Sequence, residues 1–293
     1  MKNPKPTPAA IGLDHVGFIT PDLTLSQALF ANLGFALTTR ADHTRTNAQG
    51  QVVSAGSSQH SVVLHSGYIE LMQITDPLAG HQLTPAIHER YGLHVLALAT
   101  SDASAWHADC LRRQVSVGPL LDWSRPVKTP ECEGLARFCF FDTPWQAKDP
   151  SYICWVQHLT PELVRSPSLL AHPNLAQALL GVTYEGPLDG LLAWGQRLQA
   201  AGATRPDDGS GLGHWRLQGA GLTLNVDADS LAVRPTALTL AFENLGPIEQ
   251  RARALGLSCL PLAGLGTGLR IDLRQACGIY LDALVSPNIA TSS

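Results

Sequence analysis

The sequence predicts an α+β protein in which four βαβββ modules form two paired sets, with cupped mixed β-sheets inside and helices outside. Two observations carry this prediction. One order of strand-like and helix-like segments recurs along the chain, and the first two copies have a histidine at the same place in their first strand. Internal repetition of this kind is the signature of a fold built from one supersecondary unit.

The first copy shows each signal in order. Residues 13–20 alternate between two faces as a strand does, and Asp22 is a suitable N-cap for the helix that follows. Apolar residues at helical spacing continue until Gly34, a residue type that often ends helices. Three further strand-like stretches complete the module, at 35–39, 61–65 and 68–74.

The later copies repeat this order, with weaker signals toward the C-terminus. The second has a strand at 93–100, a helix that Asp102 can cap, and strands near 115, at 136–141 and at 152–156. The third has a strand at 180–185, a helix at 188–201 and strands at 214–218 and 222–226. The fourth has a strand at 237–242, a helix at 248–255 and strands near 268–272 and 279–284.

A stretch rich in Pro, Ser and His separates the second copy from the third and is the best domain boundary. We therefore expect a first module pair at 1–165, a linker at 166–174 and a degenerate second pair at 175–293. Two long segments at matching places in the first two copies, 41–58 and 119–133, are predicted as loops. Loops of this length often close over a site.

Composition limits the classes of function. The 293 residues are 45% apolar and 15% charged, which is typical of a globular chain. A net charge of -4 without a run of Lys or Arg argues against nucleic acid and anionic membrane as partners. Without an apolar signal-peptide core or a stretch of 18 apolar residues, we expect a cytoplasmic monomer or homodimer. Six scattered cysteines without a CxxC pair favour reduced thiols over a disulfide framework.

Three polar residues in the first two copies suggest a metal site. Aligning the first strands without gaps places His15 on His94, and aligning the last strands on the prolines that follow them places Glu70 on Cys154. Burying a lone polar group costs roughly 2–7 kcal/mol, and a metal would supply the partner. Two imidazoles and one carboxylate would leave coordination positions open for substrate. Singly, each histidine also fits an ordinary core or surface position, and the glutamate fits an ion pair with an arginine.

Longer stretches of the N-terminal half carry a family resemblance. LDHVGFITPDL at 13–23, GYIELMQITDP at 67–77, and GLARFCFF with VQHLTPEL within 134–163 resemble glyoxalase-like domains of the vicinal oxygen chelate superfamily. The resemblance is good over about residues 11–165 and only architectural over 175–286. In that superfamily, paired modules form a cup that holds a metal through the first and last strand of each module.

The resemblance implies ligands and also shows a departure. The implied ligand positions are His15, Glu70, His94 and Cys154, and the implied cofactor is one divalent metal, Fe, Mn, Ni or Zn. Glyoxalases and epimerases usually have a second carboxylate where Cys154 stands. The remaining His-His-Glu set resembles the iron(II) triad of extradiol dioxygenases.

Further residues are candidates for contact with a small-molecule substrate. His158 and Tyr68 are the candidate acid/base groups. Arg137, Cys154 and Met72 are the candidate substrate-binding groups. A guanidinium such as that of Arg137 matches a carboxylate, although an ion pair with a core acid explains it equally well.

Three functions follow as hypotheses. The first is a metal-dependent enzyme of the extradiol dioxygenase type, acting on a small organic substrate with neighbouring oxygens. The second is a glyoxalase-type lyase or epimerase with Glu70 as base, and the third is a non-catalytic protein that sequesters a small molecule. The second half lacks the ligands, because Gly181 stands where His15 stands in the first copy. We expect it to be structural, an accessory pocket or a dimerisation surface.

Overall fold

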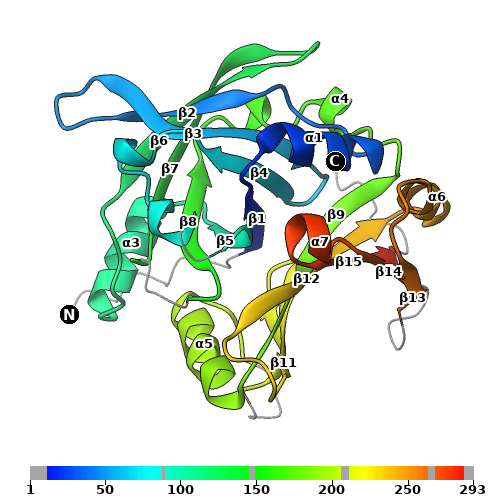
Figure 1. Ribbon diagram of the computed structural model, residues 1–293. Coiled ribbons are helices and arrows are strands. Elements are labelled where there is room, and N and C mark those ends of the chain that lie inside the picture. The colour runs from blue at the N-terminus through cyan, green and yellow to red at the C-terminus, as the bar shows by residue number, and fades with distance from the viewer. Residues whose placement is uncertain (1–11, 88–89, 145–148, 206–210, 263–267, 287–293) are drawn as a thin grey trace.

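The computed structural model of the chain describes residues 12–87, 90–144, 149–205, 211–262 and 268–286. The strands divide into a closed barrel from the N-terminal half and an open seven-stranded sheet from the C-terminal half. Figure 1 shows the barrel in blue to green, with the C-terminal sheet, light green at β9 and yellow to red beyond it, packed below and beside it. The predicted α+β fold with mixed sheets is confirmed.

Eight strands close the barrel in the order β1-β4-β3-β2-β6-β7-β8-β5. They are β1 (Gly12–Ile19), β2 (Ala41–Thr46), β3 (Val52–Val63), β4 (Tyr68–Ile74), β5 (Gly92–Ala99), β6 (Leu121–Lys128), β7 (Glu133–Asp142) and β8 (Tyr152–His158). In each module the first strand lies parallel to the last, β1 beside β4 and β5 beside β8. The two modules join through the antiparallel pairs β1/β5 and β2/β6.

Most of the two segments predicted as loops is strand. Residues 41–58 form β2 and half of β3, and β6 lies inside 119–133. These segments contain few of the β-branched and aromatic residues that mark a strand, yet each lies between two neighbours that pair with its backbone. The stretches at 35–39 and near 115 are not strands. This correction matters because β2 and β6 turn side chains into the barrel.

Helices cover the outside of the sheets. The longer ones are α1 (Leu23–Asn32), α3 (Ala103–Arg112), α5 (Leu188–Ala200) and α6 (Gly246–Ala254), and the short ones are α2 (Thr84–Ile87), α4 (Pro167–Leu170), α7 (Arg274–Cys277) and the 3-10 turns η1 (Pro77–Ala79) and η2 (Pro161–Leu163). The predicted N-caps are confirmed. Asp22 accepts hydrogen bonds from two backbone N–H groups of α1, and Asp102 accepts one from α3.

The C-terminal sheet repeats the module order but does not close. Its strands are β9 (Ala176–Gly186), β10 (Gly213–Leu217), β11 (Ala220–Val226), β12 (Arg234–Phe242), β13 (Cys259–Pro261), β14 (Gly268–Asp272) and β15 (Tyr280–Val285). They lie in the order β10-β11-β9-β12-β15-β14-β13, again with a first strand parallel to a last one in β9/β11 and β12/β15. In the part of the third module that the structure describes, two strands follow the helix, where the sequence pattern of the first module has three.

A single hydrophobic cluster spans both halves, from Val16 on β1 to Val182 on β9. The segment 166–174, expected as an exposed linker, is held against the barrel. His172 accepts a hydrogen bond from Ala36 N–H at 2.9 Å and lies 2.8 Å from the carbonyl of Val63, and Asn174 is fully buried. Within the described ranges, no helix is long and apolar enough to cross a membrane.

Candidate functional site

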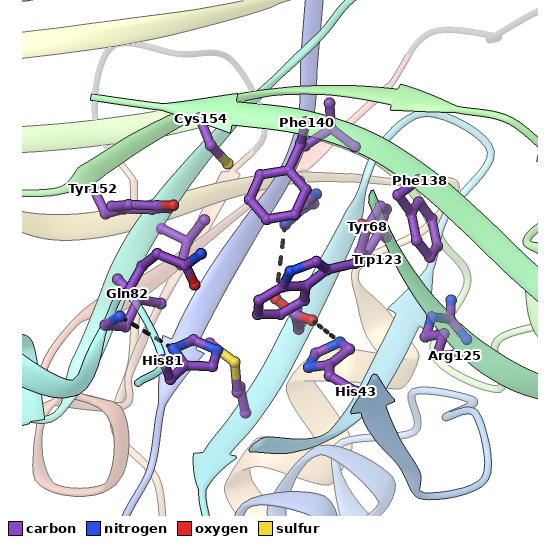
Figure 2. Close-up of a pocket in the computed structure, with 16 residues that line it drawn as sticks. His43, Tyr68, His81, Gln82, Trp123, Arg125, Phe138, Phe140, Tyr152 and Cys154 are labelled. Atoms are coloured by element: carbon purple, nitrogen blue, oxygen red, sulfur yellow. Dashed lines mark hydrogen bonds and ion pairs between the residues drawn. The ribbon is translucent and has the colours of Figure 1, made fainter. Parts of the chain in front are cut away.

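The barrel encloses a pocket with a volume of about 650 Å³, including its open mouth. Its wall is rich in aromatic rings, and polar side chains lie on both sides of it, with Arg125 toward one side and His81 and Gln82 toward the other (Figure 2). The lining side chains are those of His15, His43, Tyr68, Glu70, Met72, His81, Gln82, Leu83, Val95, Trp123, Arg125, Phe138, Phe140, Tyr152, Cys154 and Val156. The sequence-predicted residues His15, Glu70, Tyr68, Met72 and Cys154 are therefore brought together in one cavity.

A β-bulge in β1 brings two neighbouring polar side chains into contact, although strand alternation would turn them to opposite faces. The register of β1 against β5 shifts between Leu13 and His15, so that Asp14 is the extra residue. Asp14 Oδ2 lies 2.8 Å from His15 Nδ1, and Asp14 Oδ1 lies 2.9 Å from His158 Nε2. Asp14 was not predicted as a site residue, because alternation alone assigns it to the face opposite His15.

His158, predicted as an acid/base group, lies outside the pocket lining. It belongs to β8, does not line the cavity, and contacts Tyr68 and Phe138 edge to face. Burial alone would raise the pKa of Asp14, but the charge of His158 and hydrogen bonds from both histidines lower it well below the usual range. Asp14 is therefore an anion that can orient both imidazoles.

Glu70 on β4 is the central anion of the pocket. Its Oε2 lies 3.8 Å from His15 Nε2, and its Oε1 lies 3.3 Å from His43 Nε2 (Figure 2). Burial would raise the pKa of Glu70, but the hydrogen bond and charge of His43 and the charges of His15 and Arg125 lower it to about 2. The carboxylate is ionised at neutral pH, with each oxygen turned to a different histidine.

Two other pocket groups stay protonated. Burial raises the pKa of the Tyr68 phenol well above its ordinary value, and the anions Asp14 and Glu70 add to this effect. Its ring stacks on His15 with centroids 4.3 Å apart. Burial also raises the pKa of the Cys154 thiol well above its ordinary value. Tyr68 can donate a proton in a hydrogen bond, whereas Cys154 is an apolar wall residue.

The structure does not bring His94 to the pocket, and this corrects the predicted ligand set. His15 pairs with Tyr68 in β1/β4, whereas the residue that pairs with Tyr152 in β5/β8 is Val95. Val95 is thus the counterpart of His15, and the gapless alignment was wrong by one residue. A shift of one residue turns a side chain to the other face of a strand. His94 accordingly lies fully buried outside the pocket, with Nε2 2.8 Å from the carbonyl oxygen of Arg90.

Arg137 is likewise one position away from the pocket. It is exposed on β7, where it pairs with Ser124 of β6. The adjacent pair, Arg125 and Ala136, faces inward, and Arg125 is only 4% exposed and lines the cavity. The guanidinium that a substrate can reach is therefore that of Arg125.

Among the pocket residues that were not predicted, His43, His81, Trp123 and Arg125 lie in segments predicted as loops or beyond the strands. His43 comes from β2, Trp123 and Arg125 come from β6, and His81 follows η1. Trp123 and Arg125 stand two positions apart, which is the spacing of one strand face. That spacing is a sequence signal that could have identified Trp123 and Arg125; it says nothing about His43 and His81.

The donor set does not fit the implied metal. Of the four family positions, counting Val95 in place of His94, only His15 and Glu70 offer an imidazole or a carboxylate, since Val95 has no donor atom and Cys154 offers a thiol. His15 and His43 approach opposite oxygens of Glu70. Among the residues that the structure describes, no three His, Cys, Asp or Glu side chains are arranged to hold a metal ion.

Comparison with protein families adds the decisive observation about ancestry. Residues 13–199, more than half of the chain, match the glyoxalase-like domain. The chain belongs to the glyoxalase-like domain family. This confirms the resemblance to the vicinal oxygen chelate superfamily, and the match extends past the barrel into α5. A comparison with proteins of curated function found no sequence match to the chain.

Solved structures share the fold of this glyoxalase-like protein at low sequence identity. A hypothetical protein from Staphylococcus aureus is 10% identical with a TM-score of 0.62, and the alignment covers 94% of this chain and all of that one. Homoprotocatechuate 2,3-dioxygenase from Arthrobacter globiformis is 12% identical with a TM-score of 0.52, covering 97% and 82%. A catechol 2,3-dioxygenase is 9% identical with a TM-score of 0.55, covering 97% and 91%. At such identities the similarity concerns the fold.

Proposed function

We propose that this protein is an enzyme that binds a small organic molecule in the barrel and moves a proton to or from it, as a glyoxalase-type lyase or epimerase does. One observation carries the proposal: the Nε2 atom of His15 faces the ionised carboxylate of Glu70 across 3.8 Å inside the barrel pocket. That distance is too long for a hydrogen bond. Nε2 of His15 therefore makes no direct hydrogen bond to Glu70, and both groups line the pocket.

Asp14 sets the tautomer that makes His15 a base. If Nδ1 of the neutral ring carries the proton, it donates to Asp14 Oδ2 at 2.8 Å, and the lone pair of Nε2 points into the pocket. His15 can then take a proton from a substrate carbon next to a carbonyl, while the electron pair stays on the substrate. The resulting imidazolium lies between Asp14 and Glu70, two anions that stabilise it.

The remaining residues have supporting roles in this proposal. His43, which lies 2.8 Å from Ser57 Oγ and 3.3 Å from Glu70, holds the carboxylate in place. Tyr68, protonated and stacked on His15, can donate to a substrate oxygen as negative charge develops there. His158, bonded to Asp14, is a positioning residue and does not touch the substrate.

Phenylpyruvate tests the proposal, because it carries an acidic C–H next to a carbonyl and an aromatic ring that suits the lining. In D₂O with a chelator present, the protein should exchange the methylene protons faster than buffer does, as followed by ¹H NMR. General base catalysis contributes about 100-fold or more, so His15→Ala should lose at least that factor over background. The exposed His214→Ala is the matched control and should retain full exchange.

Two outcomes would contradict the proposal. Exchange no faster than buffer would favour the sequestering hypothesis. Activity that depends on re-loading with Fe²⁺, Mn²⁺, Ni²⁺ or Zn²⁺ would favour the metal-dependent hypothesis, which the fold shared with two dioxygenases and the retained His15 and Glu70 support. That hypothesis needs a third protein ligand. The pocket position at which His94 was predicted is occupied by Val95, which has no donor atom.

A further inference from the structure

Arg125 is a buried cation without a carboxylate partner. Its side chain lies on β6 at 4% exposure, and no carboxylate of the described residues is within the 4.0 Å ion-pair distance of its guanidinium. With its carboxamide oxygen facing Arg125, Gln59 accepts a hydrogen bond from Nε at 3.1 Å. Of the five N–H donors of a guanidinium, the four on the two terminal nitrogens are then left for other partners.

Glu70 does not serve as that partner. It acts on Arg125 electrostatically, but its two oxygens are turned to His15 and His43. Burying an ion costs several kcal/mol unless an opposite charge and hydrogen bonds compensate. The Phe138 ring, whose centroid lies 5.8 Å from the guanidinium carbon, supplies a cation–π contact and no charge. The guanidinium is therefore best satisfied by an anion that enters the pocket.

Two further donors in the pocket lack an acceptor. His81 Nδ1 accepts from Leu83 N–H at 3.1 Å, and burial lowers the pKa of His81 to about 3, so the neutral ring carries its proton on Nε2. Among the described residues, neither His81 Nε2 nor the indole nitrogen of Trp123 has a hydrogen-bond partner, and both atoms are buried. The two rings meet edge to face with centroids 5.3 Å apart. Buried donors of this kind are paired in most folded proteins, so they indicate a ligand that brings oxygen acceptors.

The aromatic wall gives the shape of that ligand. Trp123 meets Phe140 edge to face, with centroids 5.2 Å apart at an angle of 88°. Figure 2 shows Arg125 and Phe138 toward one side of the pocket, His81 and Tyr152 toward the other, and Trp123 between them. Rings that surround a narrow cavity favour a flat or aromatic body.

We infer that the substrate of this pocket is a small aromatic carboxylate, whose carboxylate pairs with Arg125 and whose ring lies among Trp123, Phe138 and Phe140. That this molecule is a substrate rests on the proposed function, whereas its binding does not depend on proton transfer. A bidentate pair between the guanidinium and the carboxylate supplies both the charge and the geometry. The acceptors for His81 and Trp123 come from further oxygens of the same molecule.

Benzoate and benzamide test the inference, because they share size and shape and differ in charge. Their dissociation constants are measured by quenching of tryptophan fluorescence and by isothermal titration calorimetry. The wild-type protein should bind benzoate at least about tenfold more tightly than benzamide. Arg125→Gln should abolish this preference, Arg125→Lys should keep part of it, and the exposed Arg137→Gln should keep all of it. Equal binding of the two probes by the wild type, or a preference that survives Arg125→Gln, would overturn the inference.

The same variants separate this inference from the proposed function. His15→Ala should lose proton exchange and keep the preference for benzoate. If Arg125→Gln does not fold, as judged by circular dichroism, Arg125→Lys decides. Tighter binding of benzoate than of benzamide by this variant, weakened by added salt, supports the inference. Equal affinity for the two probes contradicts it. Preference for benzoate without proton exchange would support the anion site and contradict the proposed catalysis.

Discussion

Glu70→Gln should remove a share of the stability that depends on pH. The carboxyl has an ordinary pKa of 4.5, and in the fold His43, His15 and Arg125 outweigh burial and lower its pKa to about 2. The difference corresponds to about 3 kcal/mol of stabilisation in favour of the ionised form. Because the folded-state pKa is the lower one, this stabilisation is fully present above about pH 4.5 and is lost as the pH falls toward about 2.

Urea unfolding followed by circular dichroism measures this share at several pH values. The free energy of unfolding of the wild type minus that of Glu70→Gln should shrink by about 2 kcal/mol between about pH 6 and about pH 3, since most of the linkage falls in that window. Glu162→Gln is the matched control, because Glu162 is exposed and its loss should leave the pH dependence of the wild type in place. A difference between wild type and Glu70→Gln that stays constant to within about 0.5 kcal/mol would refute the ion cluster around Glu70.

Three further predictions follow from the placement of individual residues. His94→Ala should destabilise the protein by about 2 kcal/mol or more, because the side chain is fully buried, yet keep phenylpyruvate exchange; loss of exchange would place His94 in the site after all. Cys154 should resist iodoacetamide at about pH 8 in the folded protein, because burial raises the pKa of its thiol; rapid labelling seen by mass spectrometry would contradict this. Limited proteolysis should spare residues 166–174, because His172 and Asn174 are buried and hydrogen-bonded. His172→Ala should expose this segment to cleavage. Early cutting of the wild type there would show a free linker between separable halves.

The sequence by itself determined the features that depend on local order. Asp22 and Asp102 cap their helices because the capping interaction involves only the next few residues. The repeat fixed the α+β class, and strand alternation placed Glu70, Tyr68 and Met72 on one inward face of β4. These outcomes need no knowledge of which strands are neighbours.

Only the tertiary structure decided the second half of the site. The counterpart of His15 is Val95 and not His94, because equivalence follows from the parallel pairing of each first strand with its last strand, which a gapless alignment cannot see. Asp14 reaches the site through a bulge that exists only where β1 meets β5. Arg125 faces the pocket because β6 has strands on both sides, and pairing with distant neighbours makes a strand of a segment whose own residues favour none.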